Sequence, residues 1–131
     1  MTDSLHLPRS LVNHLLHQAQ IAPGGRMAGL IGAKGGHAQS FYASDVNANA
    51  TTAREVPLKA LQTQGETLLA ILSSHPDSPA EPSAQELADS DHPNTHRFII
   101  SLNTKGVLEL RGFKRIEPSG WQEIELLLLE E

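Results

Sequence analysis

The sequence predicts one α/β domain in which a mixed, curved β-sheet is flanked by an N-terminal helix and by short helices. Its 131 residues fit one domain with one core, so the whole of 1–131 is expected to fold as a unit. Short apolar segments rich in branched side chains predict strands, and other segments have apolar residues at helical spacing. The order helix, hairpin, helix, strand, helix and then strands indicates an α/β domain with a mixed sheet.

The first half of the chain predicts two helices and a β-hairpin. An apolar stripe from Leu11 to Ala19 marks the first helix, which begins at Pro8 and ends at the Pro-Gly-Gly sequence of 23–25. The glycines at 29 and 32 are expected to allow close backbone packing, and those at 35 and 36 to form the hairpin turn. The expected elements are a helix over 8–21, strands over 27–33 and 37–46, a polar loop over 47–53 and a short helix over 54–63.

The second half centres on an apolar strand that ends at a proline. Residues 67–72 run into Ser73-Ser74-His75-Pro76, where the proline has no N–H to donate to a neighbouring strand. A proline-rich crossing then leads to a short helix that opens at Ser83. Strands are expected over 97–102 and 106–115, and 121–131 predicts a last strand, although its Glu and Leu residues also favour a helix. The apolar residues 126–129 either complete the core or form a dimer contact.

The composition excludes several classes of protein and site. The chain has no cysteine, which excludes disulfides, thiolate nucleophiles and zinc fingers, so any metal would be held by His, Asp or Glu. The net charge of −5 and the scattered Lys and Arg residues argue against nucleic-acid binding. No segment approaches the ~20 apolar residues of a membrane span, and the start lacks the basic and apolar regions of a secretion signal. We therefore expect a soluble cytoplasmic protein.

Two segments on either side of the proline-rich crossing carry the candidate site residues. His75 ends a strand and Ser83-Ala84-Gln85-Glu86 opens a helix, so a stiff loop holds an imidazole near a carboxylate. Ser83 and Glu86 also fit a capping box, in which each side chain satisfies a backbone N–H at the helix start. His14 and His17 lie on the polar face of the first helix and are expected to face solvent. Lys34 precedes its glycines inside a hairpin, which is the wrong order for a phosphate-binding loop.

This layout resembles the JAMM/MPN metalloprotease family, whose domain is also called JAB or Mov34/MPN/PAD-1. The family pattern is His-x-His-Pro at a strand end, a loop and then Ser-x-x-Asp, with a glutamate opening an earlier strand that continues Gly-Leu-Leu-Gly. In this chain the corresponding segments are Ser73-Ser74-His75-Pro76, Ser83-Ala84-Gln85-Glu86 and Arg26-Met27-Ala28-Gly29-Leu30-Ile31-Gly32. The loop of 77–82 is similar to that of bacterial members, and the resemblance extends over about residues 11–115. It implies the MPN fold for the whole domain.

The resemblance also implies a chemistry. In active members the two histidines and the aspartate hold Zn²⁺, and a water molecule takes the fourth position. Strand residues i and i+2 point to one side, so His-x-His offers two imidazoles to one ion. The glutamate accepts the proton of the water, and the serine helps to bind the developing oxyanion. The family's substrates are peptide or isopeptide bonds at the C-terminus of ubiquitin-like proteins, and bacterial relatives process ubiquitin-like sulfur carriers.

This chain departs from the family pattern at the positions that carry the chemistry. Ser73 replaces the first histidine and is a poor zinc ligand, and Glu86 replaces the aspartate. Arg26 replaces the glutamate; a guanidinium cannot act as a base, and its positive charge opposes a nearby zinc ion. His75 and Ser83 keep the family residues. We therefore expect no bound metal and no metalloprotease activity.

Three functions follow from the resemblance and its departures. The first is a pseudoenzyme that binds the tail of a ubiquitin-like or sulfur-carrier protein along a sheet edge. The second is an active zinc isopeptidase that uses other ligands, for which the candidates are His92, His96 and His37. The third keeps the pocket for a small anion or carboxylate, bound by Arg26, His75 and Ser83.

We also predict an ion pair between Arg26 and Glu86, flanked by His75 and Ser83, that stands in for the metal. If both side chains point into the space of the zinc ion, pairing relieves the cost of burying either charge alone. A planar guanidinium grips a carboxylate with two N–H bonds, and Glu reaches further than Asp across this gap. The alternative is that Glu86 only caps its helix and Arg26 lies on the surface.

Overall fold

In the part of the chain that the computed structural model describes, the regular elements are a mixed seven-stranded sheet, two α-helices and a short 3-10 helix at Pro23–Gly25. The described residues are 4–35, 37–44, 50–77, 80–81, 95–102, 108–115 and 120–129. The elements are β1 (Ser4–Pro8), α1 (Arg9–Ile21), β2 (Ala28–Lys34), β3 (His37–Ala43), α2 (Ala50–Thr63), β4 (Thr67–His75), β5 (His96–Ser101), β6 (Glu109–Arg115) and β7 (Trp121–Leu129). The predicted α/β class with a mixed sheet is confirmed.

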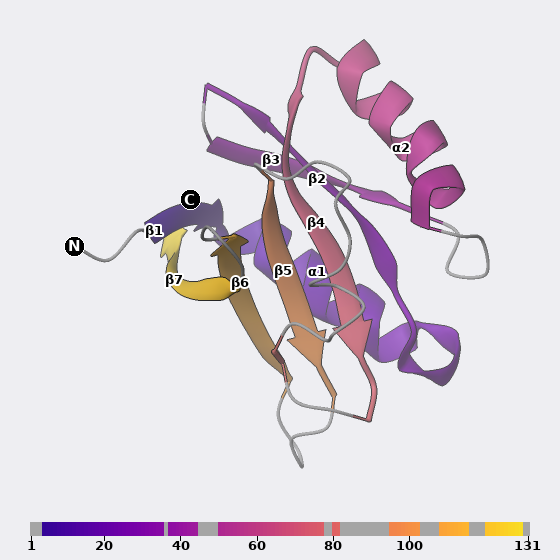
Figure 1. Ribbon diagram of the computed structural model, residues 1–131, viewed down its shortest axis with the longest axis vertical. Coiled ribbons are helices and arrows are strands. Elements are labelled where there is room, and N and C mark those ends of the chain that lie inside the picture. Colours follow the sequence, from indigo (N-terminus) through magenta and orange to yellow (C-terminus); the bar gives the residue numbers. More distant parts are fainter. Residues whose placement is uncertain are drawn as a thin grey trace.

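The sheet combines antiparallel and parallel pairing. Its spatial order is β1-β7-β6-β5-β4-β2-β3. The pairs β4–β5 and β1–β7 are parallel, and the other neighbours are antiparallel. β1 also lies next to β3, so the two ends of the sheet approach each other and the sheet is strongly curved (Figure 1).

The curved sheet wraps around α1, which lies behind it in Figure 1. The predicted stripe of α1 is buried, except that Leu16 is only partly so, and side chains from every strand pack around it. Each buried leucine here contributes about 1.5–3 kcal/mol. His14 and His17 are exposed, as predicted, and the His14 ring lies edge-on against Phe41 with the ring centroids 6.3 Å apart.

The opposite face of the sheet is covered in two halves. α2 covers the β2–β4 half, where Leu61 packs against Leu30 and Ile71. Over the β5–β6 half, Ala80 is completely buried against Ile99 and Phe113. Ala80, which follows β4 in the chain, therefore lies over β5 and β6 on this face.

Several predicted boundaries were wrong. The strand Ser4–Pro8 was not predicted, and Pro8 closes that strand instead of opening the helix, which begins at Arg9. α2 begins at Ala50, so residues 50–53 are helical and not part of a polar loop, and Pro57 lies inside the helix. In contrast, β4 ends at His75, directly before Pro76, as predicted.

The final segment is a strand over Trp121–Leu129, and the helical alternative for it was wrong. Ile124 is buried and Leu126 packs on the core around α1, whereas Leu128 is 44% exposed. The apolar end of β7 therefore contributes in part to the core. The predicted helix opening at Ser83 lies outside the described residues.

Two glycines of β2 allow other groups to approach the strand closely, as predicted. A Cβ atom on Gly29 would lie 2.5 Å from the backbone oxygen of Tyr42 on β3. A Cβ atom on Gly32 would overlap Oε1 of Glu66 and lie 3.2 Å from Leu61. In the hairpin, Gly35 has a φ of +59°, which glycine adopts without strain.

Glu66 places a carboxylate in the interior above Gly32. The residue is only 8% exposed, and its Oε2 accepts a hydrogen bond of 2.8 Å from the Tyr42 hydroxyl. Its Oε1 is buried and has no hydrogen-bond partner among the described residues. Burial, followed by the hydrogen bond to Glu66 and the charge of Glu66, raises the pKa of Tyr42 above its ordinary value of 10.0. One polar contact therefore joins β3 to the start of β4.

Gly32→Ala should lower the free energy of unfolding by about 1–3 kcal/mol, because the new methyl group displaces Glu66 and breaks its bond to Tyr42. Adding Glu66→Ala should recover part of this loss, because it removes the overlapping atom. Gly29→Ala is the matched control, since its methyl group meets a backbone oxygen that Glu66→Ala leaves in place. Denaturant unfolding of the single and double variants measures the coupling. Equal recovery of both glycine variants would contradict the arrangement.

Tyr42 is the single tyrosine of the chain, so the ultraviolet absorbance of tyrosinate reports its titration alone. In the folded protein the midpoint should lie above 10.0, and Glu66→Gln should lower it, because it removes the carboxylate charge. Since the folded pKa is the higher one, this tyrosine stabilises the fold fully below the unfolded pKa and loses that contribution as the pH rises through the folded value. An unchanged midpoint in Glu66→Gln would show that the two groups are not in contact.

Candidate functional site

Three strand ends meet at one end of the sheet and form the candidate site. β4 and β5 are parallel, and their last residues, His75 and Ser101, are direct partners. β2 is antiparallel to β4, so it begins beside the end of β4, with Ala28 opposite Ser73. In Figure 1, the arrowheads of β4 and β5 lie toward the lower end of the molecule, and β2 begins beside them. The structure therefore brings the predicted residues 26, 73 and 75 to one end of the sheet.

The hydroxyl group of Ser74 extends the pairing between β2 and β4. The Ser74 N–H donates to the backbone oxygen of Met27 at 2.9 Å. Its Oγ accepts from the Met27 N–H and donates to the backbone oxygen of Gly25, both at 2.7 Å. Since Gly25 and Met27 flank Arg26, these bonds fix the backbone of Arg26 against the end of β4. We call this arrangement the Ser74 clamp.

The last ladder pair is Ala28 with Ser73, and the bonded residues Met27 and Ser74 continue its register. Extending this register by one residue puts Arg26 opposite His75. The glycines before it, at φ of +63° and +69°, turn the chain from α1 into β2. Arg26 itself is extended, with φ −97° and ψ 116°, and its N–H donates to the Pro23 oxygen at 3.2 Å. Met27 is buried in the core around α1, so Arg26 leaves the strand on the opposite face, where it is exposed to solvent.

Ser73 and His75 share this face with Arg26, because alternate residues of a strand point to the same side. Both residues are half-buried. On the β5 side, their partners are Ile99 and Ser101, which are completely buried. The site is thus bounded by β5, and the exposed guanidinium lies on its β2 side.

Ser83 and Glu86 lie outside the described residues, and so the Arg26–Glu86 ion pair stays a prediction. The exposure of Arg26 changes its expected strength. An ion pair with a solvated guanidinium stabilises the fold by about 0–1 kcal/mol. This is far less than the stability lost when one partner of a buried pair is removed. The cost of burying the arginine charge, which motivated the pair, does not arise at an exposed position.

Two of the three alternative zinc ligands that the sequence suggested, His96 and His37, lie away from this site. His96 begins β5 opposite Ala70, five residues before Ser101, which places it roughly 16 Å away along the strand. His37 begins β3 opposite Lys34, at the other end of β2 from Arg26. His92 lies outside the described residues. Within the described ranges, no group of three or more His, Asp or Glu residues could hold a metal ion.

A second cluster anchors the segment that leaves β4. Arg111 on β6 donates two hydrogen bonds to Glu123 on β7, lies 5.4 Å from the centre of the Phe113 ring and lies 3.8 Å from Glu81. The hydrogen bond from Arg111 lowers the pKa of Glu123, and the same bond raises the pKa of Arg111. With Ala80 buried beneath, this cluster holds residues 80–81 close to the sheet. No spacing in the sequence indicated this cluster, because its members are far apart in the chain.

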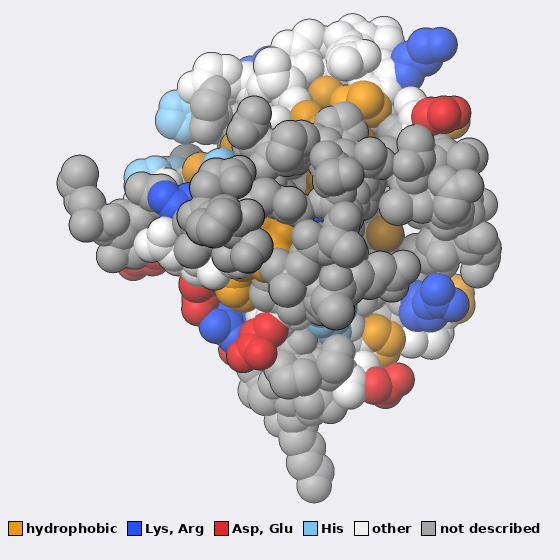
Figure 2. All heavy atoms as spheres, in the orientation of Figure 1, with side chains coloured by type: hydrophobic (Ala, Val, Ile, Leu, Met, Phe, Trp, Pro, Cys, Tyr) orange, Lys and Arg blue, Asp and Glu red, His pale blue; other side chains and the backbone are white. Residues whose placement is uncertain are grey.

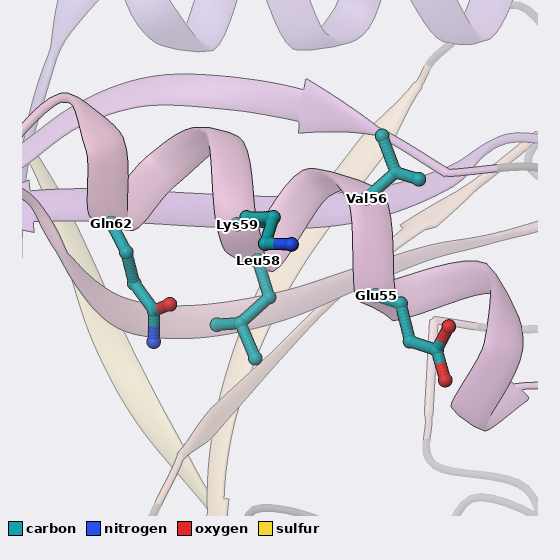
Figure 3. Close-up of a pocket in the computed structure, with 5 residues that line it drawn as sticks. All are labelled: Glu55, Val56, Leu58, Lys59 and Gln62. Atoms are coloured by element: carbon teal, nitrogen blue, oxygen red, sulfur yellow. The ribbon is translucent and has the colours of Figure 1, made fainter.

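A groove of about 450 Å³ runs along α2, away from the strand ends (Figure 3). Its described lining consists of Glu55, Val56, Leu58, Lys59 and Gln62. Val56 is 77% exposed, and Leu58 points to the same side of the helix as Gln62 (Figure 3). One carboxylate and one amine along a helix do not make a catalytic arrangement, so we do not assign the groove a role in the candidate site.

The charged side chains form no single-sign patch on the face shown in Figure 2, where the coloured basic and acidic groups are interspersed. Neither α1 nor the described part of α2 is long and apolar enough to cross a membrane.

Comparison with known proteins identifies related folds but no family. No protein-family model and no curated protein matches the chain. The solution structure of protein DSY2949 from Desulfitobacterium hafniense is similar with a TM-score of 0.73 at 23% identity, covering 97% of this chain and 94% of that one. The solution structure of a protein from Salinibacter ruber has a TM-score of 0.69 at 21% identity, covering 96% of this chain and 92% of that one. The chain is similar in fold to both structures over nearly its whole length.

Proposed function

We propose that this chain is an MPN-type metalloprotease-like protein without metalloprotease activity, and that it binds the tail of a partner protein. The partner class that the family resemblance implies is a ubiquitin-like or sulfur-carrier protein. The observation that carries the proposal is the register of β2 against β4, in which Arg26 lies beside His75. A fixed cation thus lies next to the imidazole that is the best zinc ligand of the strand end.

The described donor set does not fit a zinc ion. Catalytic zinc sites use three protein ligands drawn from His, Asp, Glu and Cys. The end of β4 offers one imidazole, from His75, and the neutral hydroxyl of Ser73. The nearby guanidinium of Arg26 repels a divalent cation, and His37 and His96 are too distant to complete the set.

Position 26, where the family has its glutamate, also lacks a general base. Hydrolysis requires a group that accepts a proton from the attacking water within hydrogen-bond reach. Arg26 cannot do so, because a guanidinium stays protonated in proteins. Loss of both the ligand and the base supports binding without cleavage.

A partner tail could be bound in extended form along a strand. β3 pairs in the ladder only with β2, and β1 approaches its other side without forming a ladder with it among the described residues. Such an edge offers backbone N–H and C=O groups to an added peptide. The exposed Arg26 at the start of β2 would lie near one end of a tail bound in this region.

Zinc titration of a restored variant tests the proposal. Wild-type protein should show no zinc binding with a Kd below ~1 μM by calorimetry. The triple variant Arg26→Glu, Ser73→His and Glu86→Asp should acquire such a site, because it restores the two family ligands that His75 lacks and removes the opposing cation. Adding His75→Ala to the triple variant should abolish the new site.

The matched control keeps Arg26 and places the charge change elsewhere, with Lys34→Glu, Ser73→His and Glu86→Asp. Lys34 is exposed at the other end of β2, so this variant should bind zinc at least about tenfold more weakly than the restored one. Tight wild-type zinc binding that depends on His75 would favour an active isopeptidase instead. A folded restored variant that binds no zinc would contradict the placement of these residues.

A further inference from the structure

We infer that the exposed guanidinium of Arg26 is a carboxylate-binding site and that Ser74 is the residue that positions it. The inference rests on the proposed partner-binding function, and it names the chemical group of the partner that this end of the sheet recognises.

The side chain of Arg26 has different surroundings from those of Arg97 and Arg111 in the sheet. Arg111 is paired with Glu123, and Arg97 is only 4% exposed. Arg26 is exposed, and its side chain forms no ion pair or hydrogen bond with any described residue. A guanidinium presents parallel N–H donors that match the two oxygens of a carboxylate, which makes that group its best-fitting ligand.

The backbone of Arg26 is fixed more firmly than an exposed cation requires. Ser74 Oγ uses its donor on the Gly25 oxygen and its acceptor on the Met27 N–H, so one hydroxyl group holds the residues on both sides. Gly25 is also held against the segment after β4, since a Cβ atom on it would lie 3.1 Å from Pro76. Fixing the backbone in advance lowers the entropy lost when the side chain binds a ligand.

The end of β4 beside Arg26 is polar, whereas the preceding part of the strand is apolar. Leu72 and Ile71 of β4 are buried in the two cores, and the next residues on the face of Arg26 are Ser73 and His75. Ser101, the partner of His75 on β5, is also polar but completely buried. A carboxylate held by Arg26 would therefore lie over polar strand ends, where its charge loses little hydration.

Lys34 provides the matched control within the same strand. It is an exposed cation at the opposite end of β2, next to the hairpin turn, and it lies outside the Ser74 clamp. Replacing either residue by glutamine removes the same charge from the chain. A difference in peptide binding between the two variants then reflects the position of the charge and not the net charge of the chain.

The test is an NMR titration of ¹⁵N-labelled protein with three capped tripeptides. Acetyl-Gly-Gly-Gly with a free C-terminus carries the carboxylate at its end, acetyl-Gly-Glu-Gly-amide carries it on a side chain, and acetyl-Gly-Gly-Gly-amide carries none. At least one of the first two should shift the amide signals of Gly25, Met27 and Ser74, and the better binder identifies the source of the carboxylate. The uncharged amide should not shift these signals.

Arg26→Gln should weaken binding of that peptide at least about tenfold, and Lys34→Gln should leave it unchanged within about twofold. Ser74→Ala should weaken binding although Arg26 is intact, and Ser74→Thr, which keeps the hydroxyl group, should restore most of it. The amide spectrum of each variant shows whether the domain is folded.

Equal binding of the uncharged amide, equal losses in Arg26→Gln and Lys34→Gln, or no shift at millimolar peptide would each overturn the inference. These outcomes are separate from the zinc titration. A failed carboxylate titration leaves the zinc result standing, and a failed zinc restoration leaves the carboxylate site standing.

Discussion

The pairing of β2 with β4 is the contact on which the rest of this structure depends. These two strands are packed on both faces, by α1 on one and by α2 on the other. At one end, the Ser74 clamp carries the pairing past the regular ladder and fixes Arg26. At the other end, Gly32 leaves room for Glu66, which joins the start of β4 to Tyr42 on β3. Both ends of β2 are therefore set by polar contacts and not by apolar packing alone.

The pattern of apolar and polar residues was sufficient to predict the helices and strands that are marked within their own sequence. The stripe of α1 has helical spacing, and apolar strands such as β4 and β5 are bounded by proline and polar residues, so these were found within a few residues. β1 was missed because its sequence Ser-Leu-His-Leu-Pro contains none of the β-branched or aromatic residues that favour strands, and its partner β7 lies at the other end of the chain. The start of α2 was missed because its first turn follows an Asn-rich segment and Pro57 lies inside the helix.

Only those residues of the candidate site that align with a known family pattern could be predicted from the sequence. The resemblance placed residue 26 at the start of one strand and residues 73 and 75 at the end of another, and the structure brings these together. Nothing in the sequence indicated Ser74, since a serine between two motif positions has no spacing signal. The same holds for Glu66 and Tyr42, which meet across 24 residues, and for Arg111 and Glu123, which meet because β6 and β7 pair.

The central claim is that Arg26 lies directly beside His75, and a designed disulfide tests it most directly. The chain has no cysteine, so Arg26→Cys with His75→Cys introduces its only thiols. Opposite residues of an antiparallel pair have Cα atoms within the range of about 4.4–6.8 Å that a disulfide spans. Mild oxidation should cross-link this variant nearly completely, whereas Lys34→Cys with His75→Cys should stay reduced, because Lys34 lies at the far end of β2. No cross-link between positions 26 and 75, or equal cross-linking in both variants, would contradict the account.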